Sequence, residues 1–186
     1  MRRPPGFQHQ FNEQVNAALA SLARSEDAPI RQLHDAVVSS PATIVIRPIT
    51  DDRSTWHDSG DPDRRHTEPA DRRSKATGRS KPTGAIVYIQ VVDVDPRSAI
   101  WNQGVLVHEL VHAVDLAYGR YHPDDTVRER RAVFLQNVWR ARFGSSLRST
   151  YHGRFATTDF QDAKRRGMLN EYAQYIFTRA DLPSPR

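Results

Sequence analysis

Apolar side chains recur at helical spacing at the start of the chain. They predict an amphipathic helix over about residues 7 to 24. A second, shorter helix is expected to follow, with Asp27 as its cap and Pro29 in its first turn. We interpret residues 1–40 as an N-terminal helical scaffold. The apolar positions of the first helix are Phe7, Phe11, Val15, Leu19 and Leu22, and those of the second are Ile30, Leu33, Val37 and Val38.

Two β-branched runs interrupt the helical pattern and predict strands at residues 43–49 and 85–94. Residues 51–83, between them, hold almost no apolar side chain except Trp56 and are rich in Asp, Arg, Ser, Thr, Pro and Gly. A connection of that length without structure is unusual within a compact domain. It therefore indicates a flexible polar insertion, either a mobile flap or a disordered segment.

Helical periodicity returns after the strands. It predicts helices at about 98–118 and 124–143, ended by Gly119 and Gly144, and a C-terminal helix at 159–180. The order of helices, strands and helices indicates an α+β fold, in which a small sheet packs against helices. The 186 residues suit one domain, 1–186, with its core at 84–152.

Composition narrows the chemistry. The chain has no cysteine, which excludes disulfides and a cysteine-ligated metal site. The 27 Lys and Arg against 22 Asp and Glu give a net charge of +5, which suggests nucleic acid as a partner. Positive and negative residues alternate along most of the chain, however, and this favours an ordinary solvated surface. No apolar run is long enough for a membrane span, and none near the N-terminus suits a classical signal peptide.

The strongest chemical signal is the segment His108-Glu109-Leu110-Val111-His112. On a helix, two histidines four residues apart project from one face, where their imidazole nitrogens can converge on one zinc ion. Glu109 is placed to take a proton from the attacking water and later pass it to the leaving amine. Asp115, one turn beyond, could accept a hydrogen bond from a ligand imidazole or could be a plain surface residue. Apolar residues surround these side chains, and buried histidines need partners.

A catalytic zinc ion usually takes three protein ligands, so a third donor is required. The sequence leaves three candidates. Glu129 lies early in the next helix, at the border of its apolar arc, or else pairs with a neighbouring arginine. Glu171 lies in an apolar C-terminal helix, and His122 lies between the zinc motif and Glu129, in the segment that joins the two expected helices.

A longer string of residues resembles a known family. The string comprises His108 to Ala113, Gly119, Glu129 to Val133, Asn137, Arg140, Gly144, Arg148 and Tyr151. It resembles the effector-type zinc metallopeptidases that bacteria deliver through secretion systems or carry as polymorphic-toxin domains. The resemblance covers about residues 84 to 152, and the N-terminal 83 residues fall outside it.

This resemblance implies a compact zincin-like domain with a small, mostly antiparallel sheet. It implies that His108, His112 and Glu129 hold Zn²⁺, that Glu109 is the general base and that Tyr151 donates to the developing oxyanion. The expected function is zinc-dependent endopeptidase activity in a bacterial effector or toxin, which resides in the bacterial cytoplasm before delivery by a secretion system. The expected partners are a protein or peptide substrate, paired along the edge of the sheet that contains residues 85 to 94, and an immunity or inhibitor protein.

Three alternatives remain at this stage. A DNA-associated zinc protease would use His122 as third ligand, and the basic charge supports it. The zinc helix also resembles lethal-factor-like peptidases, in which Glu171 would be the ligand, but Lys164 stands where that pattern has tyrosine. A non-catalytic, zinc-stabilised binding module would have no need of Glu109 as a base.

Overall fold

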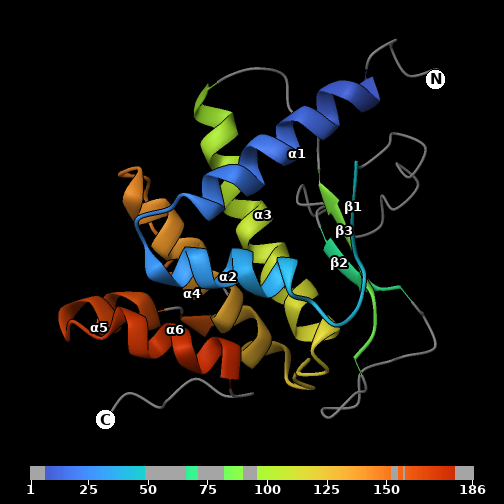
Figure 1. Cartoon of the computed structure of the whole chain (residues 1–186). Coiled ribbons are helices and arrows are strands. Elements are labelled where there is room, and N and C mark those ends of the chain that lie inside the picture. The colour runs from blue at the N-terminus through green and yellow to red at the C-terminus, as the bar shows by residue number, and fades with distance from the viewer. Residues whose placement is uncertain are drawn as a thin grey trace.

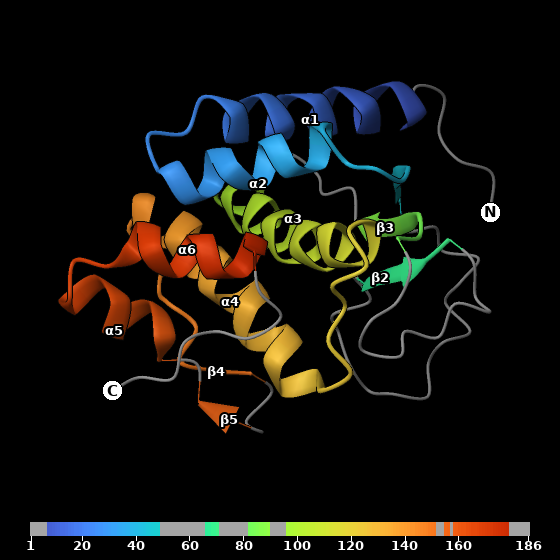
Figure 2. The same cartoon turned by 60° about the horizontal axis from the view of Figure 1, so that its bottom comes forward.

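The structure is a computed structural model that describes residues 7–48, 66–70, 82–89, 96–151, 155–156 and 158–178. Six helices and five strands lie in these ranges. Figure 1 and Figure 2 show how they are arranged. The elements are α1 (Phe7–Ala23), α2 (Ala28–Val38), β1 (Ile44–Pro48), β2 (His66–Pro69), β3 (Ala85–Ile89), α3 (Pro96–Ala117), α4 (Asp125–Arg142), β4 (Thr150–Tyr151), β5 (Phe155–Ala156), α5 (Asp159–Arg165) and α6 (Leu169–Thr178).

The helices expected in the first half of the chain are confirmed, with differences at the ends of α2. Phe11 and Leu22 of α1 and Ile30 and Leu33 of α2 are buried, as their spacing predicts. Val38 is 72% exposed, so its expected burial is wrong; it is the last residue of α2, where the helix leaves the core. Asp27 occupies the N-cap position of α2, but its side chain makes no capping hydrogen bond.

The sheet differs from the expected one. Its order is β1-β3-β2, and the two strands found in the sequence, β1 and β3, pair in parallel, with Ile44 opposite Ala85. The expected mostly antiparallel sheet is therefore wrong for this pair, and only β2 runs antiparallel to β3. A parallel pair needs a long crossover, and the 36 residues between Pro48 and Ala85 provide it. The hydrophobic pattern alone does not distinguish the two directions.

The polar stretch at 51–83 also contributes to the sheet. Residues 66–69 form β2, so this part of the expected flexible insertion is an ordered edge strand. Most of the remaining stretch, and residues 90–94 of the second expected strand, lie outside the described residues. The strand was missed because His66 to Pro69 carries no apolar alternation.

Helix α3 lies at the centre of the molecule, with α1 and α2 on one side of it, α4 on another and the sheet near its C-terminal half (Figure 2). Every residue from Gly104 to Ala117 is buried, so the polar residues within this stretch are enclosed by protein. Its end and that of α4 are confirmed at Gly119 and Gly144, whose φ angles of 66° and 63° stop the helices in the left-handed region.

The C-terminal segment forms two helices instead of the single one expected at 159–180. The α5 helix ends before Gly167, whose φ of 67° turns the chain, and α6 begins at Leu169. The Met168 amide donates to the Ala163 carbonyl across this turn, which is a typical glycine-ended helix terminus. Within the described part of the chain, no helix combines the length and the apolar character that crossing a bilayer requires.

Candidate metal centre

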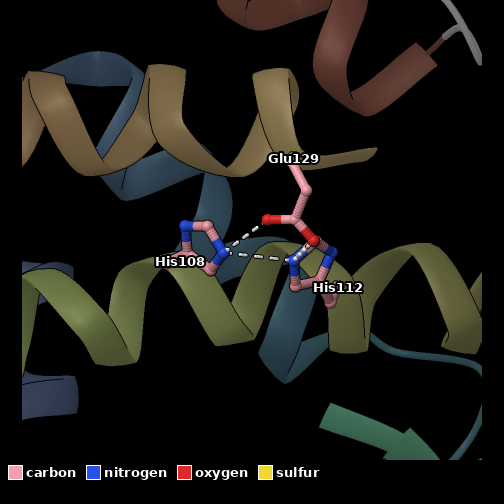
Figure 3. Close-up of side chains that lie close together, drawn as sticks. All are labelled: His108, His112 and Glu129. Atoms are coloured by element: carbon pink, nitrogen blue, oxygen red, sulfur yellow. Dashed lines mark hydrogen bonds and ion pairs between the residues drawn. The ribbon is translucent and has the colours of Figure 1, made fainter. Parts of the chain in front are cut away.

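The two histidines of the motif project from the same side of α3, one turn apart (Figure 3). Their Nε2 atoms are 3.2 Å apart, and the rings meet edge to face with centroids 4.9 Å apart. His108 and His112 are only 5% and 6% exposed. The predicted convergence of the imidazoles is confirmed, because the i, i+4 spacing of a helix brings them together before any tertiary contact is made.

Glu129 reaches this pair from α4. One carboxylate oxygen lies 3.0 Å from Nε2 of His108 and the other lies 3.4 Å from Nε2 of His112 (Figure 3). Gly119 stops α3, and Asp124 caps the start of α4, where its carboxylate accepts a hydrogen bond from the Thr126 amide at 2.8 Å. The glycine and the cap allow the chain to reverse direction, so that α4 crosses α3 and Glu129, in the second turn of α4, lies next to the histidines.

The three buried side chains form a group that could hold a metal ion. The other two third-ligand candidates are placed differently. Glu171 is exposed on α6, and Nδ1 of His122 accepts a hydrogen bond from the Asp124 amide at 3.0 Å. Neither belongs to the group.

The spacing of the donor atoms suits a tetrahedral ion. Zinc binds imidazole nitrogen and carboxylate oxygen at about 2.0 to 2.1 Å, so neighbouring donors at the corners of a tetrahedron lie about 3.3 to 3.4 Å apart. The two imidazole nitrogens are 3.2 Å apart, and each has a different oxygen of the Glu129 carboxylate near it, at 3.0 Å for His108 and 3.4 Å for His112. The separation of the imidazoles therefore fits one divalent cation, with the Glu129 carboxylate close enough to contribute a ligand oxygen.

The charged groups around the two imidazoles also favour a cation. Burial alone would raise the pKa of Glu129, but its hydrogen bonds to His108 and His112 outweigh burial and hold the pKa far below its ordinary value. Burial alone would lower the pKa of His112, but the carboxylates of Glu129, Glu109 and Asp115 outweigh it and raise the pKa. These carboxylates thus favour positive charge at the two imidazoles, which a bound divalent cation could supply.

Glu109 follows the first histidine on α3 and is 6% exposed. Its carboxylate accepts a hydrogen bond from the Thr67 hydroxyl at 2.8 Å, and its charge acts on His112. The structure therefore places an acidic side chain beside the metal-binding group without including it in the group. Thr67 could not be singled out from the sequence, because it lies in a strand without a hydrophobic pattern, 42 residues away.

Asp115 has a different partner from the one expected. Its carboxylate accepts a hydrogen bond from Arg131 at 2.8 Å, and both side chains are buried, at 1% and 0% exposure. Burial raises the pKa of Asp115 to about 6, although the nearby charges of Arg131 and Arg120 lower it. The hydrogen bond expected from a ligand imidazole is not seen: among the described residues, Nδ1 of His112 has no hydrogen-bond partner. The ion pair instead joins α3 to α4 beside the ligands.

Two further residues of the sequence string have a structural explanation. The Asn137 amide group pairs with the main chain of Arg148 in both directions, at 2.8 Å each, and Arg140 donates to the Ser146 carbonyl at 2.6 Å. These bonds fasten the segment after Gly144 onto α4, and that segment leads to β4. Tyr151 lies in β4 opposite Phe155, but its side chain falls outside what the structure describes, so its role as an oxyanion donor stays a prediction.

Comparison of the chain with known protein families, with curated proteins and with solved structures finds no match. The resemblance to effector-type metallopeptidases is therefore untested. What can be said of the function follows from the chemistry of His108, Glu109, His112 and Glu129.

Proposed function

We propose that this protein is a zinc-dependent endopeptidase in which His108, His112 and Glu129 hold the metal and Glu109 is the general base. The single observation that carries the proposal is the convergence of two imidazoles, 3.2 Å apart, with a carboxylate whose two oxygens lie 3.0 and 3.4 Å from them, next to a buried glutamate. Zinc bound by these ligands would polarise the scissile carbonyl and acidify the attacking water.

The protein's own residues have separate tasks in this reaction. Glu129 and the two histidines fix the metal between α3 and α4. Glu109 accepts a proton from water as the carbonyl is attacked and then donates it to the amine of the departing peptide. Among the described residues the group supplies three ligands, the number that a catalytic zinc site takes from the protein, and Glu109 stands beside it as a base that a structural site would not need. This favours the enzyme over a zinc-stabilised binding module.

A peptide is the favoured substrate because the site adjoins a sheet edge. In the described sheet β2 is an edge strand, and its Thr67 side chain contacts Glu109. An extended peptide paired with that edge would pass beside the base, with recognition largely through main-chain hydrogen bonds. Zinc as the metal, bacterial delivery as an effector or toxin, and an immunity or inhibitor protein are parts of the proposal that rest on the donor set and on the family resemblance.

The alternative with His122 as third ligand is not favoured. Glu129 already lies between the two histidines, whereas His122 caps the turn before α4.

The test is Glu109→Gln, which keeps the size of the side chain but removes the base. We expect the variant to retain about one zinc per chain and to lose activity by about 10² to 10⁴ fold, the usual contribution of a general base. Metal content is measured by elemental analysis. Cleavage is measured by proteomic comparison of cells that express the wild type or the variant, and then on the cleaved protein in purified form.

Glu171→Gln is the matched control, because it makes the same chemical change at an exposed position. It should retain both metal and activity. Loss of zinc from Glu109→Gln would contradict the assignment of Glu109 as a base that does not bind the metal. Undiminished cleavage by Glu109→Gln would exclude the proposed mechanism.

A further inference from the structure

Strand β2 brings a hydroxyl group to the proposed base. The Thr67 hydroxyl lies 2.8 Å from Oε2 of Glu109 and 3.0 Å from the Glu109 main-chain oxygen. Thr67 is partly buried, and β2 is joined to α3 through this side chain. The two residues come from elements 42 positions apart, so the contact depends on the sheet being formed.

The register of the sheet explains why Thr67 points to α3. Thr67 stands opposite Val87 of β3, and residues directly opposite each other in an antiparallel pair share one face of the sheet. Val87 is fully buried and belongs to the core that surrounds α3. Thr67 therefore lies on the core face of β2, and a shift of one residue would turn its side chain to the opposite face.

A general base must be held in a defined orientation, and a hydrogen bond to its carboxylate can do this. Glutamate has several rotatable bonds, and general-base catalysis requires its carboxylate within hydrogen-bonding distance of the proton that it removes. The hydroxyl has one hydrogen, shared between the carboxylate and the main-chain oxygen of the same residue. Both acceptors belong to Glu109, so either bond limits where this residue can lie relative to β2.

We infer that Thr67 is a positioning residue, whose hydroxyl holds the Glu109 carboxylate in its working orientation and makes strand β2 part of the active site. The inference rests on the proposed function. It gives a role to a strand within the polar stretch between β1 and β3. The same strand would then align an extended substrate and orient the base that acts on it.

The experiment compares Thr67→Val, which keeps the shape but removes the hydroxyl, with Thr67→Ser, which keeps the hydroxyl. We expect the valine variant to bind zinc as the wild type does and to lose about 10 to 100 fold in kcat with little change in KM, because misplaced catalytic groups cost up to about 10² fold. The serine variant should recover most of the loss. A purely structural anchor would not produce this division between kcat and KM.

Three kinetic results would overturn the inference: wild-type kcat in the valine variant, a serine variant as impaired as the valine variant, or a loss confined to KM. A second measurement needs no activity. The unfolding stabilities of Thr67→Val, Glu109→Ala and the double variant form a cycle, and removing the hydroxyl should destabilise the protein less when Glu109 is alanine.

The two measurements separate this inference from the proposed function. If the wild type cleaves protein and Thr67→Val cleaves equally well, only the inference fails. If the wild type binds zinc but cleaves nothing while the cycle still shows coupling, the contact exists but serves no reaction, and the inference fails together with the proposed function. Strict additivity in the cycle would show that the hydroxyl and the Glu109 side chain do not interact.

Discussion

Replacing Glu129 with alanine is expected to lower the zinc affinity by about 10² to 10³ fold. Structural zinc in zinc-finger peptides is bound with about 10 to 16 kcal/mol over four ligands, or roughly 2.5 to 4 kcal/mol for each, and every 1.4 kcal/mol is tenfold. Glu129 is the only carboxylate of the described group, so its loss also removes the negative charge that balances the cation. Competition with a chromophoric chelator measures the change.

Thermal unfolding gives a second reading of the same variant. Zinc at about 100 times its dissociation constant should stabilise the wild type by about 2.7 kcal/mol, and a chelator should remove this gain. Glu129→Ala should show almost none of it at the same zinc concentration. Glu171→Ala, at an exposed position of α6, should behave as the wild type. The reverse result for the two variants would move the third ligand to the C-terminal helix.

The second large effect concerns the buried ion pair next to the metal centre. Arg131→Met should destabilise the protein by about 3 to 5 kcal/mol, because it leaves the Asp115 carboxylate buried without its charged hydrogen-bond donor. Combining it with Asp115→Leu should restore most of the lost stability, since two apolar side chains can replace a buried pair at little cost. Urea unfolding of the two single variants and the double variant measures both effects.

Arg165→Met is the control for this prediction. Arg165 also pairs with an aspartate, Asp162, but its side chain is 77% exposed, and exposed ion pairs contribute about 0 to 1 kcal/mol. A loss in Arg131→Met no larger than in Arg165→Met would show that burial of the pair does not matter. We also expect weaker zinc binding in Arg131→Met, because the pair holds α3 and α4 together two residues from Glu129.

Local signals in the sequence were sufficient for the helices. The helical spacing from Phe7 to Leu22 and the glycines at 119 and 144 give α1, α3 and α4 nearly their observed ends. Gly167 also divides the C-terminal segment into two helices. A glycine alone does not predict such a break, because the break depends on the left-handed conformation that Gly167 adopts in the structure. The sheet was predicted less well. Strand direction, and the existence of β2, depend on pairing between distant residues.

The sequence by itself determined the pairing of His108 with His112, because side chains four residues apart on a helix lie on the same face. Only the tertiary structure places Glu129, and not Glu171 or His122, beside this pair, since that placement depends on where α4 crosses α3 and not on any local spacing. The same holds for Thr67 and Arg131, which meet Glu109 and Asp115 across 42 and 16 residues. The helix brings together the two imidazoles of the candidate metal centre locally, and packing between elements supplies the rest.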